Sequence, residues 1–256
     1  MSRKKYKLST VKSKKTGNNI AFKYIKAQIK KKPASLLALA AGRTTDGLHK
    51  LISNSAKKNP HFWRQVKVLQ IDEIVGAKPT SSLSFNFELN CELKDLFKII
   101  KTKNVCLING NQNFKKTISN LKKFISKNKG IDLITLGIGP HYDPHIAYNT
   151  KGKAFLNSSV HVVKLHPKTA RNIKKRIKEK RGGIKKSFKK GVTLGIKDIL
   201  GAKKAILLAY GEEKSRSLDL AFNKNIDVKN VPGSALQLHK NLYIVTDKLA
   251  GKCLVK

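Results

Sequence analysis

The sequence predicts an α/β fold in which helices cover a parallel sheet. Three observations support this class. Short apolar runs of strand length recur along the chain, segments with helical periodicity lie between most of them, and several runs end in small or acidic residues. Because ligands of open α/β sheets bind outside the carboxyl ends of the strands, the residues that follow each run are the first candidates for a functional site.

Seven apolar runs are the expected strands, because each is short and rich in Leu, Ile, Val or Ala. They are residues 36–41, 66–71, 105–108, 133–136, 160–165, 205–209 and 242–245. The segments between them have the pattern of helices. These are residues 46–57, 83–100, 114–127, 169–180, 193–200 and 212–222.

The remaining segments are the expected loops. Residues 140–158 and 181–191 have the most loop-like composition, and the second holds Gly182 and Gly183 within a lysine-rich stretch. No linker or internal repeat divides the 256 residues. We therefore expect one domain over residues 1–256, with a basic N-terminal segment at 1–32.

Composition excludes several classes of protein. With 40% apolar residues and a mean hydropathy of −0.37, the chain can bury a core and is not a disordered basic protein. The longest apolar runs are far shorter than the roughly 20 residues of a membrane helix, and no apolar stretch after Lys5 forms a secretory signal. We expect a cytoplasmic protein without a membrane partner. Cys91, Cys106 and Cys253 are far apart, which favours reduced thiols over a disulfide or a metal cluster.

The charge is strongly positive. Lys and Arg total 55 against 15 Asp and Glu, a net charge of +40, and the basic residues concentrate at 1–32 and 164–190. Such clusters attract phosphate polyanions in a salt-dependent way, so non-specific binding of nucleic acid through the basic surface is one interpretation. The other is that lysine has accumulated on solvated faces, since aromatic residues are not interleaved with the runs and no known nucleic-acid-binding signature is present.

The first expected strand leads into a Gly-x-Thr turn at Gly42 and Thr44, directly before a helix. Glycine lets the backbone approach an oxyanion, the threonine hydroxyl donates a hydrogen bond, and the helix N-terminus adds amide dipoles. A phosphate would fit there. Ordinary turn and cap chemistry explains the same residues, so this turn alone does not decide between the two.

Two further strands end in groups that can transfer protons. Asp72 and Glu73 follow the second run, and only one of them can face a cleft because neighbouring side chains of an extended segment diverge. A shielded carboxylate there could act as a general base, or the acid could cap a helix or form a surface ion pair. A Gly-x-Gly turn after residue 136 is followed by Asp143 and His145, a carboxylate that could orient an imidazole.

Taken together, these residues resemble the glucosamine-6-phosphate deaminase family over about residues 34–250. Six segments carry the resemblance in order. They are LAAGRT at 39–44, IDEIVG at 71–76, LGIG at 136–139 with DPHIAYN at 143–149, VTLGI at 192–196 with Leu200, AKK at 202–204 with GEEK at 211–214, and SALQLH at 234–239. The sister family of 6-phosphogluconolactonases has the same fold, but residues 146–149 and 234–239 are closer to the deaminases.

The resemblance implies a Rossmann-like domain with helices on both faces of its sheet. In the family the sugar ring opens, a proton moves from C2 to C1, and ammonia leaves to give fructose 6-phosphate, without a cofactor or a metal. By position, Asp72 matches the base that carries the proton. His145 matches the acid and base of ring opening, and Asp143 matches the carboxylate that orients it.

The resemblance also implies a phosphate site and an assembly. Gly42 and Thr44 match the phosphate loop, and Lys214 matches the phosphate-binding lysine. Arg43 replaces a small residue of that loop, as an added clamp or as a plug. Arg171 lies one position after the place of a phosphate-binding arginine and would replace it after a one-residue shift. Since family members associate, a homo-oligomer is expected.

The chain departs from the family pattern in the segment that carries Asp143. Two residues are inserted before it, Pro144 replaces a glycine, and Thr150 stands where a glutamate that assists ring opening is expected. Proline cannot adopt a positive φ or donate an N–H, so the loop backbone must differ. These departures leave two alternatives open: a 6-phosphogluconolactonase-like hydrolase, or a catalytically inactive basic member that binds nucleic acid.

Overall fold

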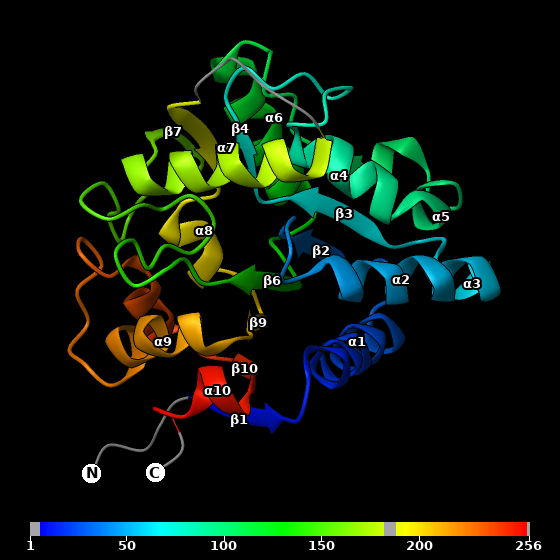
Figure 1. The fold of residues 1–256 in the computed structure, drawn as a ribbon. Coiled ribbons are helices and arrows are strands. Elements are labelled where there is room, and N and C mark those ends of the chain that lie inside the picture. Colours follow the sequence, from blue (N-terminus) through cyan, green and yellow to red (C-terminus); the bar gives the residue numbers. More distant parts are fainter. Residues whose placement is uncertain (1–5, 182–187, 255–256) are drawn as a thin grey trace.

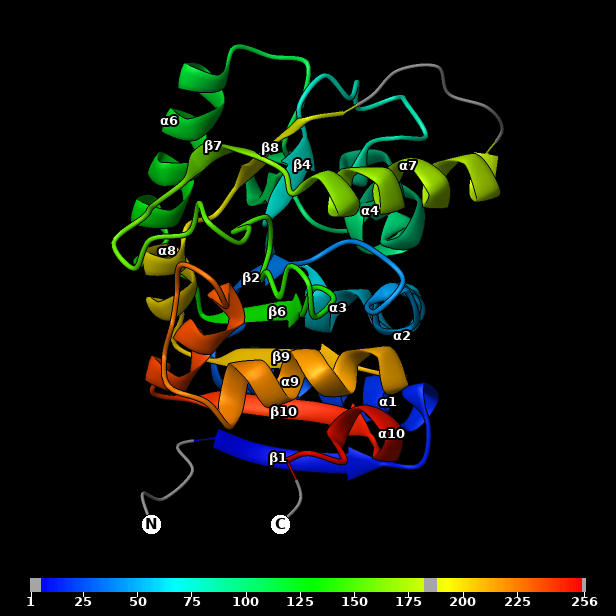
Figure 2. The same cartoon turned by 60° about the vertical axis from the view of Figure 1, so that its left-hand side comes forward.

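The fold is seen in a computed structural model that describes residues 6–181 and 188–254. The first five residues of the basic segment and residues 182–187 of the second expected loop lie outside the described residues. Seven strands form one parallel sheet in the order β1-β10-β9-β6-β2-β3-β5 (Figures 1 and 2). The strands are β1 (Tyr6–Val11), β2 (Leu36–Leu39), β3 (Lys67–Gln70), β5 (Val105–Cys106), β6 (Leu133–Gly137), β9 (Ala205–Ala209) and β10 (Leu242–Asp247). The predicted α/β class with a parallel sheet is confirmed.

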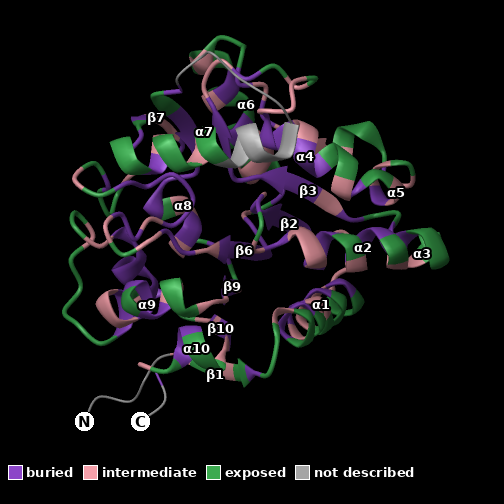
Figure 3. Cartoon of the chain, in the orientation of Figure 1, coloured by how far each residue is buried: buried purple, intermediate pink, exposed green. Residues whose placement is uncertain are grey.

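Helices cover both faces of the sheet because its strands alternate their side chains between two apolar clusters. In β2, Leu37 and Leu39 pack with one set of helices, whereas Leu36 and Ala38 pack on the other side. The first face carries α1 (Lys14–Lys31), α2 (Asp46–Lys58), α3 (Pro60–Trp63), α4 (Phe85–Glu92) and α5 (Lys94–Phe97). The second carries α6 (Phe114–Lys127), α8 (Ile196–Leu200), α9 (Ser215–Phe222), the 3₁₀ segment Pro232–Leu238 and α10 (Lys248–Gly251). Figure 3 shows the strands β2, β3 and β6 between them as mostly buried, whereas the edge strand β1 is more exposed.

A second, three-stranded sheet corrects two of the predicted elements. It has the order β4 (Asp72–Ile74), β8 (Lys190–Thr193) and β7 (His161–Lys164), and both pairings are antiparallel. The run at 160–165 is therefore a strand, but it does not belong to the parallel sheet. The expected loop at 181–191 ends in β8, and α7 (Pro167–Arg181) packs over this smaller sheet through Ala170 and Ile173.

Three predicted helices have different limits in the structure. The helix expected over 83–100 divides at Leu93, the buried C-cap of α4, and continues as the short α5. The helix expected over 193–200 begins only at Ile196, because Thr193 belongs to β8 and Gly195 is the N-cap. The helix expected over 212–222 starts with one 3₁₀ turn, Glu212–Lys214, before α9.

The basic segment at 1–32 contains β1 and α1, which the sequence did not predict. Ser13 caps α1 by accepting a hydrogen bond from the Thr16 N–H (3.2 Å), and Ala21, Ile25 and Ile29 bury one face of the helix. Lys14 at the start of α1 donates to the Arg43 carbonyl and, at 2.7 Å, to the Asp46 carboxylate. Part of the N-terminal charge therefore supports the turn that follows β2.

A buried carboxylate fixes the opposite end of the sheet. Asp132, 1% exposed, accepts hydrogen bonds from Lys32 (2.6 Å), Lys203 (2.8 Å) and the Leu36 N–H (2.9 Å). Burial by itself would raise the pKa of Asp132, but the two lysines and the N–H outweigh it and lower the pKa.

Replacing Asp132 with alanine is expected to lower the free energy of unfolding near pH 7 by roughly 1–3 kcal/mol, since the Leu36 N–H loses its acceptor. A carboxylate with a lowered pKa stabilises the fold above its unfolded value of about 3.9, and this contribution is lost as the pH falls through the folded value. Urea unfolding should therefore show the difference shrinking at acid pH. Asp227→Asn, at an exposed carboxylate, is the control, and an equal loss there would contradict the prediction.

The order of the strands places a crevice between β2 and β6. The chain leaves β2 toward β3 and β5 and later returns to β6 on the other side of β2. Open α/β sheets bind ligands at the carboxyl ends of strands where the order reverses in this way. Among the described residues, no helix is long and apolar enough to cross a membrane.

Candidate active site

A cavity of about 250 Å³ lies at the carboxyl ends of β2, β3 and β6, at the crevice described above. The loop after β2, the start of β4, the loop after β6, helix α7 and Lys214 form its walls. The residues used below are Gly42, Arg43, Thr44, Asp72, Gly139, Tyr142, His145, Tyr148, Thr169, Asn172 and Lys214, all of which line the cavity. Six of the predicted site residues therefore line one cavity. They are Gly42, Arg43, Thr44, Asp72, His145 and Lys214.

The turn after β2 is held by its own backbone. Gly42 has a φ of 120°, a conformation that favours glycine, and its carbonyl accepts from the N–H groups of Thr45 (3.1 Å) and Asp46 (3.2 Å). Thr45 is buried and donates its hydroxyl to the Ala40 carbonyl (2.7 Å). Thr45 therefore holds the turn, while Thr44 faces the cavity beside Gly137.

Two cations lie at the same end of the cavity as this turn. The half-buried Lys214 donates to the Ile138 carbonyl at 2.8 Å. Burial lowers the pKa of Lys214, Glu213 opposes this, and the nearby Arg43 lowers it further. Because two positive groups face each other there, an anion between them would relieve their repulsion. This end of the cavity fits a phosphate.

Asp72 and Glu73 point to different sides, as the sequence predicted. Asp72 pairs in register with Thr193 of β8, is 7% exposed and lines the cavity. Glu73 is fully buried and accepts hydrogen bonds at the start of α4, among them from the Ser84 hydroxyl (2.7 Å) and the Asn86 N–H (2.8 Å). Burial raises the pKa of Glu73, although these hydrogen bonds oppose the shift. Asp72 is therefore the carboxylate available to a ligand.

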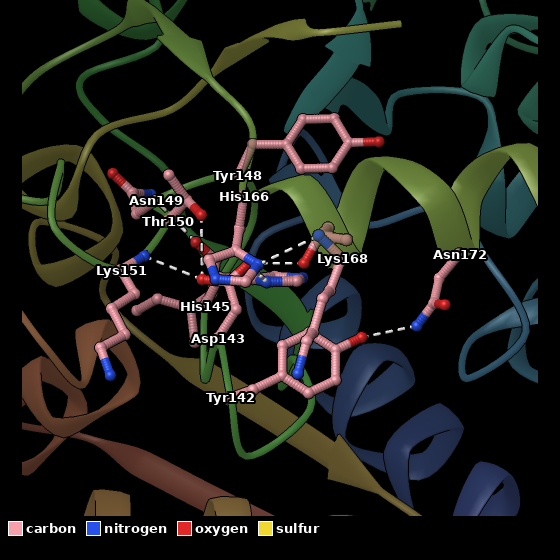
Figure 4. A network of polar contacts seen from close by, with 12 residues as sticks. Tyr142, Asp143, His145, Tyr148, Asn149, Thr150, Lys151, His166, Lys168 and Asn172 are labelled. Atoms are coloured by element: carbon pink, nitrogen blue, oxygen red, sulfur yellow. Dashed lines mark hydrogen bonds and ion pairs between the residues drawn. The ribbon is translucent and has the colours of Figure 1, made fainter. Parts of the chain in front are cut away.

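His145 and Asp143 form the pair expected from the sequence. The Nδ1 atom of His145 lies 2.9 Å from a carboxylate oxygen of Asp143, which is fully buried (Figure 4). Burial would raise the pKa of Asp143, but hydrogen bonds and the charge of the imidazolium form of His145 hold it well below its usual range. Because an ionised carboxylate only accepts hydrogen bonds, Nδ1 donates to it, and Nε2 is the nitrogen that can exchange a proton with a ligand.

The loop that carries this pair is closed by a short backbone contact. The Gly139 N–H donates to the His145 carbonyl at 2.8 Å, and a Cβ added at Gly139 would lie 2.3 Å from the Asp143 carbonyl oxygen and 2.5 Å from His145 Nδ1. The second glycine of the Gly-x-Gly turn therefore permits the close approach. The two inserted residues lengthen the loop, and Pro144 replaces a glycine in it. Neither change breaks the Asp143–His145 contact.

Gly139→Ala is expected to lower the free energy of unfolding by roughly 1–3 kcal/mol, because backbone atoms must move to accommodate the methyl group. Gly137→Ala is the matched control in the same turn, since its Cβ would meet only Thr44 at ordinary contact distances of 3.6–3.9 Å. Thermal or urea unfolding of both variants checks this. Equal stability of the two variants would contradict the assignment of a tight turn at Gly139.

Helix α7 places a different set of residues at the cavity from the one the sequence suggested. Thr169, Asn172 and Ile173 line it, whereas Arg171 is exposed and does not. The role of Arg171 in phosphate binding therefore stays a prediction without support from its position. Tyr142 was not predicted as a site residue. It lies in the inserted part of the loop and lines the cavity, and its hydroxyl accepts a hydrogen bond from the Asn172 amide (2.6 Å). Its position directly before Asp143 was the available signal.

Comparison with known proteins agrees with this geometry. A model of the family described as glucosamine-6-phosphate isomerases/6-phosphogluconolactonase matches residues 13–244. The chain belongs to this family. A glucosamine-6-phosphate deaminase of Clostridium botulinum (strain Langeland) is 33% identical over 231 residues, which cover 90% of this chain and 91% of the relative. The protein of that name from Clostridium novyi is 33% identical over 238 residues, covering 91% and 94%.

Solved structures of the family have the same fold. A monomeric glucosamine-6-phosphate deaminase superimposes with a TM-score of 0.86 at 24% identity, over 96% of this chain and 99% of that chain. A 6-phosphogluconolactonase from Trypanosoma cruzi gives a TM-score of 0.77 at 18% identity, over 98% and 97%. Both enzyme classes of the family therefore share this architecture, and the chemistry must be argued from the site.

Proposed function

We propose that this member of the family converts glucosamine 6-phosphate, or a close hexosamine phosphate, and water to fructose 6-phosphate and ammonia. One observation carries the proposal. A single cavity is lined by the carboxylate Asp72, by His145, which Asp143 holds from its buried side, and, beside the turn after β2, by the cations Arg43 and Lys214. Sequence relatives named glucosamine-6-phosphate deaminase support this reaction over others of the same fold.

The residues suit the successive proton transfers. His145 Nε2 accepts the proton of the anomeric hydroxyl and returns it to the ring oxygen as the ring opens. Asp72 then removes the proton from C2 and delivers it to C1, a transfer between neighbouring carbons that one carboxylate can perform. Burial of Asp72 limits exchange of that proton with water. Water adds to the resulting imine carbon at C2, and ammonia leaves.

The phosphate would bind beside the turn after β2. Lys214 supplies a positive charge, the Thr44 hydroxyl supplies a donor, and Arg43 at the rim adds a second positive charge. Binding energy at a group remote from C2 holds the reacting carbons in place and so contributes to the rate as well as to affinity. No cofactor is part of this proposal.

The test is to incubate the pure protein with glucosamine 6-phosphate and to follow both products. Ammonia and fructose 6-phosphate should appear in equal amounts. Absence of turnover by the wild-type protein would refute the proposal. The same preparation should be tested with 6-phosphogluconolactone, because hydrolysis of this lactone without deamination would assign the chain to the other class of the family.

Thr150 is the observation that favours the second class. In deaminases of the pattern described above a glutamate occupies this position, and the structure has a neutral hydroxyl there that donates to Asp143 (2.9 Å). Lactone hydrolysis needs a single base to activate water, and it does not include the opening of a sugar hemiacetal that the glutamate assists in the deaminases. A 6-phosphogluconolactonase-like activity is therefore the second candidate function.

We further infer a single domain, since both sheets contribute to one apolar cluster through residues such as Leu136 and Val192. The cytoplasmic location stays a prediction. The homo-oligomer and non-specific binding of nucleic acid remain predictions of ours. Light scattering at low and high salt tests the first, since a chain of net charge +40 repels its copies at low salt. Binding of RNA and DNA over a salt series tests the second.

A further inference from the structure

Asp143 is surrounded by four hydrogen-bond donors. One carboxylate oxygen accepts from the Thr150 hydroxyl (2.9 Å) and the Lys151 N–H (2.8 Å). The other accepts from His145 Nδ1 (2.9 Å) and the Thr169 hydroxyl (2.6 Å). An ionised carboxylate offers about four lone-pair sites, so the donors fill its capacity. Figure 4 shows Asp143 with His145, Thr150 and Lys151 around it.

The two hydroxyls come from separate parts of the fold. Thr150 lies at the end of the loop that carries Asp143, and it occupies the position of the family's glutamate. Thr169 lies on the first turn of α7, lines the cavity and reaches Asp143 across 26 residues of sequence. Both threonines are buried, so water does not compete for the carboxylate. The Thr169 bond therefore joins this loop to α7, whereas the Thr150 bond lies within the loop.

We propose that Thr150 and Thr169 are positioning residues that clamp the Asp143 carboxylate, so that His145 keeps its Nδ1 proton on Asp143 and presents an unprotonated Nε2 to the cavity. Thr150 places a neutral donor where the family pattern has a second carboxylate. The effect of the clamp on catalysis depends on the proposed function, whereas its effect on the imidazole does not.

The geometry gives this arrangement a physical reason. A carboxylate with vacant lone pairs can rotate or turn its other oxygen toward His145, and each arrangement would hold the imidazole differently. With both oxygens occupied, only one orientation satisfies all four donors. Other titratable groups close to the pair are Tyr142, which interacts with Asp143, and Tyr148, whose ring lies 6.5 Å from that of His145. Asp72 and Lys214 face it across the cavity.

The experiment compares Thr169→Val with Thr169→Ser by ¹⁵N NMR of the His145 imidazole in the ligand-free protein. The wild type is expected to show the neutral imidazole with its proton on Nδ1, next to Asp143. Thr169→Val, which is nearly isosteric, should shift the Nδ1 resonance, because the Asp143 carboxylate then accepts one hydrogen bond fewer and is held less firmly, and Thr169→Ser should restore the wild-type spectrum. Thr117→Val is the matched control, since Thr117 is buried on α6 and donates to the Asn113 carbonyl.

Kinetics provide the second measurement. Thr169→Val is expected to lower kcat by about 10-fold or more, the effect of losing one hydrogen bond to an ionised group, with little change in KM. Thr169→Ser should restore kcat. A merely structural role would change stability without this split between kcat and KM.

Unchanged imidazole spectra in Thr169→Val, or failure of Thr169→Ser to restore them, would overturn the clamp. If Thr169→Val does not fold, Thr150→Val and Thr150→Ser test the same carboxylate from the other side. The NMR measurement needs no substrate. A protein that shows the change in the imidazole spectrum but no turnover of glucosamine 6-phosphate would therefore refute the proposed function and leave the clamp standing.

Discussion

Asp72→Asn is expected to lower kcat for glucosamine 6-phosphate by about 10²–10⁴-fold, the usual contribution of general acid–base catalysis. The amide keeps the shape of the side chain but cannot accept the C2 proton. KM should change much less, because the substitution leaves the proposed phosphate contacts in place. Steady-state kinetics, with release of ammonia as the signal, check this prediction.

Exchange of the C2 proton separates the loss of a base from a general disturbance of the site. In deuterated water, the wild-type protein should transfer the C2 hydrogen of the substrate to C1 or exchange it for deuterium. Asp72→Asn should do neither. Asp198→Asn is the control, since this half-buried carboxylate caps α8 and accepts a bond from Ser159 outside the cavity. Turnover in Asp72→Asn equal to that of wild type would remove Asp72 from the mechanism.

Lys214→Ala is the second substitution with a large expected effect. Loss of one partner of a buried charge pair costs about 2–4 kcal/mol, which corresponds to a fall in kcat/KM of roughly 30- to 1000-fold. Much of the loss should appear in KM. The lysine is half-buried and donates only to the Ile138 carbonyl among the hydrogen bonds described for it, so it can turn to a ligand at small cost.

A substrate without the phosphate tests the assignment directly. Turnover of glucosamine should be slow in both proteins and nearly insensitive to Lys214→Ala, because the contact under test is then absent. Arg43→Ser should show a smaller loss for the phosphorylated sugar, and a gain would mean that Arg43 blocks the site. Lys252→Ala, which breaks only an exposed pair with Glu212, is the control. An unchanged kcat/KM for Lys214→Ala would place the phosphate elsewhere.

The central strands were predictable from the sequence because they are buried on both faces. The runs that became β2 and β9 contain almost only apolar residues, since both of their faces pack against helices. Helix α1 was missed because its apolar positions Ala21, Ile25 and Ile29 stand among many lysines that project to solvent. The strand at 160–165 was placed in the wrong sheet, because an apolar run does not specify its pairing partner.

Some residues of the site could likewise be predicted from the sequence, and others could not. Asp72, Asp143 and His145 could be found because each follows a strand and because the order of the motifs matches a family. Thr169 could not, since its contact with Asp143 depends on where α7 lies over the loop. The alternation of side chains along a strand correctly predicted that only one of Asp72 and Glu73 would face the cavity.

The pairing of β1 with β10 has a consequence for how the molecule is made. Tyr6 lies opposite Leu242, so this edge joins segments separated by 236 residues of chain. Contacts between such distant segments form slowly, and on a ribosome the first strand must wait for its partner to be synthesised. The buried face of α1 also packs with Val245 of β10. We therefore expect Lys14 to reach the turn at Arg43 late in folding. A chain that has already formed its central strands would still lack the Lys14 contacts that support this turn of the proposed phosphate site.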